Sequence, residues 1–211
     1  MSTGPKPGLR PEEALAARAG RRQALRRQGI ERRMALPPPT HAALSTRVCA
    51  LIQQHFPELA GMHVAFCWPY KNEPDLRPLM QSWLAEGNPG YAALLPVVID
   101  ADRALAFRAW TPTSPMHTDR YGIPTPTSGD FLTPEALLIP VNVFDTRGYR
   151  IGYGGGYFDR TLAALDPAPL CIGVAFELAR TETTHPQPHD QPMDWIVTEA
   201  GSFRARPDLS D

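Results

Sequence analysis

Hydrophobic residues near the N-terminus recur with the period of a helix. Residues 11–36, rich in Ala, Arg, Glu and Gln, favour one helix, and the prolines at 37–39 end it. A second helix is predicted over 41–55, because its apolar residues follow an i, i+4, i+7, i+8 spacing and share one face. This apolar stripe consists of Leu44, Val48, Leu51 and Ile52.

From residue 62 the pattern changes to short apolar runs of the kind that form buried strands. The predicted strands are 62–67, 92–99, 104–110, 136–144 and 170–176. Helices are predicted at 76–85 and 157–165, and the stretch 111–133, heavy in Pro, Ser, Thr and Gly, is expected to be loop. Strands and helices therefore alternate along most of the chain.

The succession of strand, turn, glycine-rich loop, helix and strand between residues 136 and 176 indicates a right-handed crossover between parallel strands. We therefore predict an α/β fold: a single-domain three-layer sandwich with a mostly parallel, Rossmann-like twisted sheet and an N-terminal basic helix. The domain is expected to span residues 11–205, with a disordered leader at 1–10, rich in Gly and Pro, and a tail at 206–211.

Composition and charge exclude several classes of protein. The 211 residues suit one domain, and 43% hydrophobic with 20% charged residues is ordinary for a globular chain. A formal net charge of −1 gives no global electrostatic case for nucleic acid. No apolar run approaches the roughly 20 residues of a membrane span, and the N-terminus lacks the apolar region of a secretory signal. Three widely spaced cysteines, Cys49, Cys67 and Cys171, predict reduced thiols and a cytoplasmic location.

The segment from Gly148 to Asp159, GYRIGYGGGYFD, carries the strongest chemical signal. Backbone N–H groups of glycine can approach an anion closely, and a helix N-terminus adds partial positive charge, so the segment predicts a phosphate site. A Walker A loop would need Lys and then Ser or Thr where Tyr157 and Phe158 stand, and the G-x-G-x-x-G fingerprint would need glycine at Tyr157. The alternative is a strand-to-helix turn without a ligand, which the triple glycine and the paired aromatics disfavour.

The first predicted helix carries seven arginines between Arg18 and Arg33. Arg18, Arg22 and Arg26 recur every fourth residue and therefore lie on one face. Such a face is usually solvated, but beside a phosphate loop it would form a clamp for a triphosphate.

Two further segments carry polar residues close to predicted strands. The loop after residue 67 contains Glu73 and Asp75 at a place where open α/β sheets bind ligands, although Asp75 is also a candidate helix cap. His185 and His189 are four residues apart, but the prolines between them prevent a helix that would align both for a metal.

The sequence GYRIGYGGGYFDR closely resembles the signature of the 5-formyltetrahydrofolate cyclo-ligase family, also called methenyltetrahydrofolate synthetases. Three other segments resemble that family in the same order, and together they cover about residues 18–200. They are Arg22-Gln-Ala-Leu-Arg26, the loop around Glu73, and HDQPMDWIVTE from His189. Arg22 stands where the family usually has Lys, and Pro74 and Leu76 also depart from the commoner residues.

The resemblance implies a set of site residues. The implied ATP-binding residues are Arg22, Gln23, Ala24, Leu25, Arg26, Arg150, Ile151, Gly152, Tyr153, Gly154, Gly155, Gly156, Tyr157 and Phe158. The implied substrate-binding residues are Trp68, Glu73, Tyr121, Tyr153, Gly154, Gly155, Gly156 and Tyr157, with loop packing as the alternative role of Tyr121. Mg²⁺ is expected on Asp159 and Asp190. Asp159 has an alternative role without any metal, because an acidic side chain in the first turn of a helix interacts favourably with the helix dipole. Asp194 is expected to position the last strand.

The resemblance also implies an ATP- and Mg²⁺-dependent ligase of one-carbon metabolism that converts 5-formyltetrahydrofolate to 5,10-methenyltetrahydrofolate. The formyl oxygen would be phosphorylated and N10 would close the ring, so no residue is assigned as a nucleophile. The expected partners are a reduced folate and ATP, with no nucleic acid or membrane. We expect a monomer, with a dimer as the alternative. Two other interpretations stay open: a cyclo-ligase-like paralogue with a different substrate, and a non-enzymatic RNA-binding module built on the arginine helix.

Overall fold

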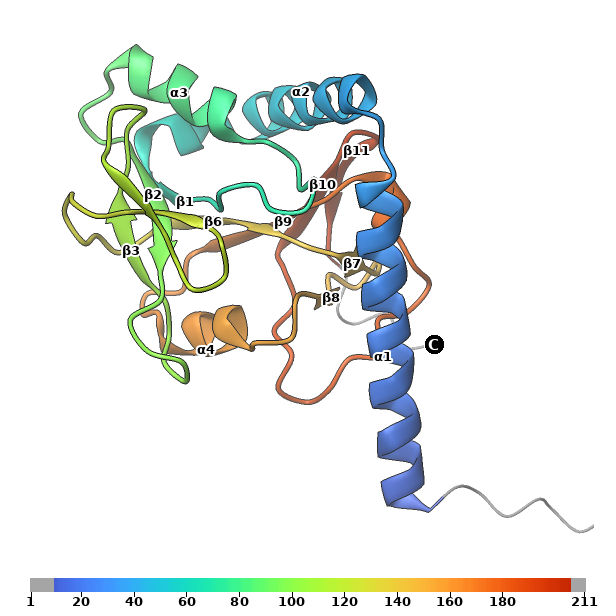
Figure 1. Cartoon of the computed structure of the whole chain (residues 1–211). Coiled ribbons are helices and arrows are strands. Elements are labelled where there is room, and N and C mark those ends of the chain that lie inside the picture. Colours follow the sequence, from blue (N-terminus) through green and yellow to red (C-terminus); the bar gives the residue numbers. More distant parts are fainter. Residues whose placement is uncertain (1–9, 206–211) are drawn as a thin grey trace, which may run out of the picture.

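The structure is a computed structural model that describes residues 10–205. The expected leader and tail lie outside these residues, apart from Arg10, the N-cap of the first helix. The helices are α1 (Pro11–Met34), α2 (Pro38–His55), α3 (Arg77–Glu86) and α4 (Tyr157–Ala164), with short 3-10 helices η1 (Pro57–Gly61) and η2 (Glu177–Ala179) (Figure 1). The strands are β1 (His63–Ala65), β2 (Ala92–Val97), β3 (Ala106–Ala109), β4 (Met116–Thr118), β5 (Pro124–Pro126), β6 (Ala136–Pro140), β7 (Val143–Phe144), β8 (Arg150–Ile151), β9 (Leu170–Val174), β10 (Trp195–Thr198) and β11 (Gly201–Arg204).

Seven of the strands form one sheet in the order β11-β10-β9-β6-β1-β2-β3. The central strands from β10 to β2 pair in parallel, and the edge strands β11 and β3 pair antiparallel, so the prediction of a mostly parallel sheet is confirmed. The chain passes from β1 to β2 on one side and later adds β6 on the other side of β1. The boundary between β1 and β6 is therefore a topological switch point, where open α/β sheets bind their ligands.

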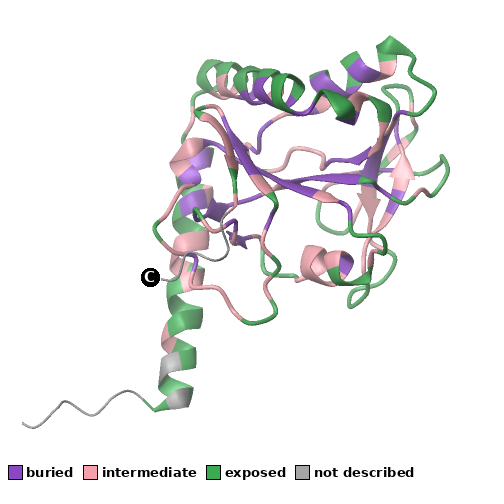
Figure 2. Cartoon of the chain, turned by 180° about the vertical axis from the view of Figure 1, so that it is seen from behind, coloured by how far each residue is buried: buried purple, intermediate pink, exposed green. Residues whose placement is uncertain are grey.

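Helices cover both faces of this sheet, which makes three layers, as predicted. α2 and α3 lie over one face and α4 lies over the other (Figure 1). Each face has its own apolar core, with Phe66 and Trp83 under α2 and α3, and Leu137 and Phe144 on the α4 side. Figure 2 shows the buried strands between helices whose outer sides are exposed. No helix within residues 10–205 is both long and apolar enough to cross a membrane.

The second half of α1 packs against the domain, whereas its first half extends away from it (Figure 1). Gly29 is buried at this contact. A larger residue would not fit there, because a Cβ would lie only 2.3 Å from the carbonyl oxygen of Asn142. Arg22 and Arg26 are half-buried and Arg33 is buried, while Arg18 is exposed. Of the arginines predicted to share one face, Arg22 and Arg26 contact the domain, Arg33 extends the contact, and Arg18 is exposed.

Two strand predictions were wrong in detail. The stretch 111–133 is not all loop, since β4 and β5 pair as a hairpin whose strand pattern is hidden by prolines. The predicted strand 136–144 is two strands: β6 ends at Pro140, and Asn142 then donates its N–H to Ile151 at 3.0 Å, which starts the β7–β8 hairpin.

The second helix begins at Pro38 rather than at residue 41. Proline is favoured in the first turn of a helix because its missing N–H has no partner there anyway, and Pro37 is the N-cap. The three prolines therefore both end the first helix and start the second.

Two acids hold the ends of elements in place. Asp194 accepts the N–H of Cys171 at 2.8 Å and so fixes the start of β10 against β9, as expected. Asp75 accepts the N–H of Arg77 at 3.1 Å at the start of α3, although Leu76 is the N-cap. Both acids have local structural roles.

Candidate active site

Two loops leave the sheet at the switch point. The Glu73 loop, residues 66–76, follows β1, and the glycine loop, residues 152–156, follows the β7–β8 hairpin that comes after β6. Because β1 and β6 are parallel neighbours, the segments that follow them start at the same edge of the sheet. The two loops touch: the Tyr153 hydroxyl donates a hydrogen bond of 2.9 Å to Glu73 Oε1.

The glycine loop is exposed at residues 153–155 and runs directly into α4. Gly154 and Gly156 have φ angles of +97° and +67°, a region that favours glycine. None of the N–H groups of residues 154–156 donates to an acceptor within the described chain. Free N–H groups at the start of a helix are suited to binding phosphate oxygens.

Arg26 of α1 lies directly against the glycine loop. Its Nε donates to the Gly152 carbonyl oxygen at 2.7 Å, and its guanidinium is 3.2 Å from the place a Cβ of Gly154 would take. Burial and the neighbouring Arg22 lower the pKa of Arg26. A bound anion would offset that repulsion, so Arg26 and the loop together form a cationic surface.

Both predicted magnesium ligands are paired with arginines. Asp190 Oδ2 lies 2.7 Å from Arg22 Nη1, and Asp159 Oδ1 lies 2.8 Å from Arg150 Nη2. Arg150 also donates to the carbonyl oxygen of Gln191 at 2.7 Å. Arg150 therefore links the start of α4 to the segment that carries Asp190.

The donor set fits a magnesium ion that is held partly by phosphate. No group of three His, Cys, Asp or Glu side chains within residues 10–205 is arranged to hold a metal by itself. Mg²⁺ is usually bound by one or two carboxylates together with phosphate oxygens, and Asp159 and Asp190 could supply these. The Asp159 side chain is 30% exposed and the Asp190 side chain 8%, so Asp159 is the more accessible of the two.

Glu73 is buried, with 2% of its surface exposed, and each of its carboxylate oxygens accepts one hydrogen bond. Oε2 accepts the N–H of Tyr70 at 3.0 Å, Oε1 accepts the Tyr153 hydroxyl, and Arg33 Nη2 lies 3.7 Å from Oε1. Burial raises the pKa of Glu73, while the charge of Arg33 opposes that rise. A buried carboxyl group with a perturbed pKa at a switch point is suited to hydrogen-bonding a polar heterocycle.

Arg33 is a site residue that sequence reasoning missed. It donates from Nη2 to the Tyr153 hydroxyl at 2.8 Å and from Nε to the Lys71 carbonyl oxygen at 2.8 Å. It lies seven residues after Arg26 and four after Gly29, and this spacing was the available signal, because it continues one face of the helix. Arg33 therefore ties both loops to α1.

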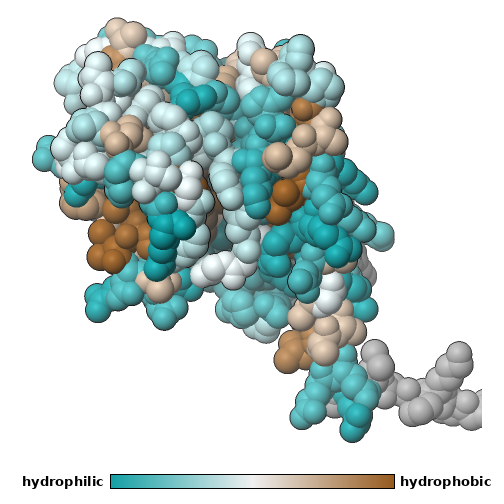
Figure 3. All heavy atoms as spheres, in the orientation of Figure 1, coloured by the Kyte–Doolittle hydropathy of each residue, from teal (hydrophilic) through white to brown (hydrophobic). Residues whose placement is uncertain are grey.

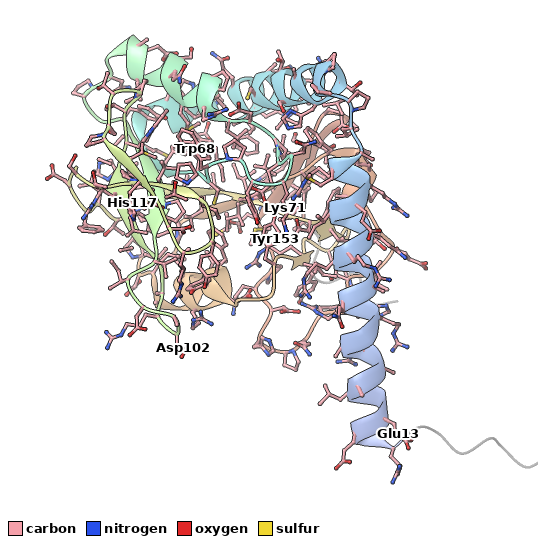
Figure 4. The ribbon with its side chains drawn as sticks, viewed as in Figure 1. Glu13, Trp68, Lys71, Asp102, His117 and Tyr153 are labelled. Carbon is pink, nitrogen blue, oxygen red and sulfur yellow. The ribbon has the colours of Figure 1, made fainter. Side chains whose placement is uncertain are left out.

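The remaining predicted substrate residues make aromatic and polar contacts with their neighbours. The Trp68 ring packs edge-on against Trp110, and the Arg77 guanidinium lies 4.7 Å from its centre. The hydroxyls of Tyr121 and Tyr157 are 2.8 Å apart, which joins the turn before β5 to the residue that follows the glycine loop. Figure 3 shows a hollow in this face between α1 and α4, in the area where Figure 4 labels Tyr153.

Other residues of the matched segments make no side-chain hydrogen bond to the two loops within the described chain. Ile151 is fully buried, and Phe158 packs against the core on the α4 side. Gln23 is exposed, and Ala24 and Leu25 are half-buried on α1. In the segment 22–26, the two arginines therefore make the polar contacts with the rest of the domain.

These features define the class of the protein. It is an open α/β sheet whose candidate ligand site, with a glycine loop, arginines and a buried carboxyl group, lies at the switch point. The model of the 5-formyltetrahydrofolate cyclo-ligase family matches residues 18–199. The chain belongs to this family of enzymes.

Individual relatives agree with this assignment. The chain is 28% identical over 176 residues to the 5-formyltetrahydrofolate cyclo-ligase of Escherichia coli K12, covering 80% of this chain and 94% of that protein. It is 27% identical over 138 residues to the corresponding protein of Haemophilus influenzae, covering 62% of this chain and 72% of that one. The solved 5,10-methenyltetrahydrofolate synthetase of Aquifex aeolicus superposes with a TM-score of 0.74 at 27% identity, over 90% of this chain and 95% of the other.

Proposed function

We propose that this chain converts 5-formyltetrahydrofolate to 5,10-methenyltetrahydrofolate with ATP and Mg²⁺. The observation that carries the proposal is the 2.9 Å hydrogen bond from Tyr153 of the glycine loop to Glu73 of the other loop. It supports the proposal because it makes the loop that we propose for phosphate and the carboxyl group that we propose for the pterin immediate neighbours. Phosphoryl transfer between two bound molecules requires such proximity.

The chemical difficulty is that an N-formyl group is amide-like and therefore a poor electrophile. In the proposed reaction the formyl oxygen attacks the γ-phosphorus of ATP, the bond to the β,γ-bridging oxygen breaks, and ADP leaves with the electron pair. N10 of the same folate then attacks the activated carbon. The carbon–oxygen bond breaks, inorganic phosphate leaves with that pair, and the N10 proton passes to solvent.

The residues of the chain contribute positioning and charge neutralisation, so no protein nucleophile is needed. The free N–H groups of the glycine loop and the guanidinium of Arg26 would hold phosphate oxygens. Glu73 would orient the pterin by hydrogen bonding. Magnesium supplies neutralisation of phosphate charge when it is bound, and Asp159 and Asp190 are the residues proposed to hold it.

The proposed partners are small molecules, and we propose a cytoplasmic monomer. The arginine helix supports a role at this site rather than on an RNA surface. Arg22, Arg26 and Arg33 all make hydrogen bonds to residues of the domain. These three arginines of α1 therefore face the domain rather than a free surface that could bind RNA.

An absorbance assay at the methenyl-folate band tests the proposal. Purified protein is incubated with 5-formyltetrahydrofolate and Mg-ATP, and parallel reactions omit ATP or add a chelator. Product is expected only in the complete reaction. Absence of product in the complete reaction would overturn the substrate assignment, and product without ATP would overturn the phosphorylation step.

A further inference from the structure

Lysine is almost absent from this chain, yet one lysine stands at the opening. Of the 21 basic residues, only Lys6 and Lys71 are lysines, and all others are arginines. Lys71 is thus the sole lysine within residues 10–205. Lysine offers a compact ammonium on a flexible stem, whereas arginine offers a planar fork, so the two are not interchangeable at a site.

The Glu73 loop holds Lys71 in an unusual conformation. Lys71 and Asn72 have φ angles of 49° and 56°, so two successive residues other than glycine occupy the left-handed region. Arg33 fastens this turn to α1, because it donates to the Lys71 carbonyl oxygen at 2.8 Å and its own carbonyl accepts the Asn72 amide at 3.4 Å. The backbone of Lys71 is therefore fixed while its side chain remains exposed.

The ammonium of Lys71 lies where the two loops meet. Its Nζ is 5.1 Å from the ring centre of Tyr70 in the Glu73 loop and 5.8 Å from that of Tyr153 in the glycine loop. These two rings are themselves 5.7 Å apart, and Figure 4 labels Lys71 and Tyr153 side by side. Among the ion pairs of residues 10–205 none includes Lys71, and its ammonium is held by cation–π attraction to the two rings.

We propose that the Lys71 ammonium meets the phosphoryl group as it passes from ATP to the formyl oxygen. This inference rests on the proposed function, in which the glycine loop holds the nucleotide and the Glu73 loop holds the folate. The bond that forms joins the formyl oxygen to the γ-phosphorus, the bond to the β,γ-bridging oxygen breaks, and ADP leaves with the electron pair. The group that crosses the junction of the loops is an anion, and Lys71 is a cation at that junction without an ion-pair partner in the part of the chain that the structure describes.

An ammonium suits this task for a physical reason. Its three donors rotate freely, and its attraction to the tyrosine rings is weak enough to let it move with the phosphoryl oxygens. A charge that interacts most strongly with the group in transit lowers the barrier without tightening substrate binding, so its removal lowers kcat more than it raises KM.

Steady-state kinetics of Lys71→Gln and Lys71→Arg test this role. For Lys71→Gln we expect kcat to fall about 10- to 100-fold, with the KM for folate changed less than about twofold, and Lys71→Arg should recover part of kcat. Arg47→Gln is the matched control, because Arg47 is an exposed cation on α2, remote in sequence from both loops. A kcat of Lys71→Gln within about threefold of that of the unchanged protein would overturn the proposal. A rise in the KM for folate with kcat unchanged would also overturn it, and would instead indicate that the ammonium binds a carboxylate of the folate tail.

Amine acetylation provides a readout that does not depend on turnover. Lys71 should be modified in the free protein and protected by ATP together with folate, while Lys6 reports the activity of the reagent in the same sample. Acetylation of Lys71 that is equal with and without the substrates would refute its place at the junction. If the unchanged protein forms product but the variants match it, the Lys71 inference alone fails; if the unchanged protein forms no product with Mg-ATP, both proposals fail.

Discussion

Replacing Arg33 by methionine would remove the cation that accompanies a buried carboxylate. The side chains of Arg33 and Glu73 are each 3% exposed, and their nearest charged atoms are 3.7 Å apart. Breaking a buried pair by removing one partner costs about 3–5 kcal/mol, because the remaining charge is left uncompensated. Since the Tyr153 hydroxyl would still donate to Glu73, we expect the lower part of that range, about 3–4 kcal/mol near pH 8.

The loss should depend on pH in a defined direction. Burial already raises the pKa of Glu73, and Arg33 opposes that rise, so the Arg33→Met protein should have a still higher folded-state pKa. A carboxyl group with a raised folded pKa contributes stability that is present below its unfolded pKa and lost as pH rises through the folded value. The destabilisation of Arg33→Met should therefore be smaller near about pH 5 than near about pH 8.

Urea unfolding followed by tryptophan fluorescence measures this difference at the two pH values. A loss of about 3–4 kcal/mol corresponds to a fall of about 6–16 °C in Tm for a chain of this size. Arg32→Met is the matched control, because Arg32 is exposed on the same helix and its replacement should change stability by less than about 0.5 kcal/mol. Adding Glu73→Gln to Arg33→Met should restore part of the loss near pH 8. A cost below about 1 kcal/mol, or one independent of pH, would refute the reasoning.

Three further outcomes are expected. Asp159→Asn should keep the fold, because the Asp159 side chain is partly exposed and makes one ion pair. It should lower turnover at saturating folate about 100-fold. A near-normal rate with Mg-ATP would contradict the proposed role of Asp159 in binding Mg²⁺. Gly155→Ala should weaken ATP binding about tenfold by calorimetry, because its Cβ would lie 3.1 Å from the Tyr157 ring. Gly20→Ala is the control, because a Cβ there meets no atom and should leave ATP affinity unchanged. Equal ATP affinities of the two variants would count against the glycine loop as the nucleotide site. Because burial raises the pKa of Glu73, the acidic limb of the pH profile of kcat/KM should lie above the ordinary pKa of glutamic acid. That limb should be absent from the pH profile of the residual activity of Glu73→Gln. An acidic limb at the ordinary pKa would contradict this prediction.

Local patterns in the sequence predicted the elements that depend on local physics. The apolar stripe from Leu44 to Ile52 lies on a helix as expected, and the crossover around α4 joins two parallel strands. The β4–β5 hairpin escaped prediction because prolines obscure its pattern. The division of the predicted strand 136–144 after Pro140 was not predicted, because apolar residues continue through that point. Only the hydrogen-bond partners change there, from the main sheet to the β7–β8 hairpin.

The arginine helix shows where periodicity stops being informative. Its spacing correctly placed Arg22 and Arg26 on one face, but no pattern states where along a helix the rest of the domain begins. The structure leaves Arg18 exposed and adds Arg33 to the buried contact, where Gly29 lets the helix approach the backbone at Asn142. The burial of an arginine is thus decided by which surface meets the helix.

The sequence by itself determined the α/β class, the loop of three glycines at the start of a helix, and the family to which the chain belongs. Those properties depend on residue type and short-range spacing, which a linear pattern contains. Only the tertiary structure decided that Glu73 and Tyr153 form a hydrogen bond, that Arg33 joins them, and that Lys71 lies over the tyrosine rings. The physical reason is strand pairing across the switch point: β6 lies beside β1, so loops far apart in the chain start from one edge of the sheet.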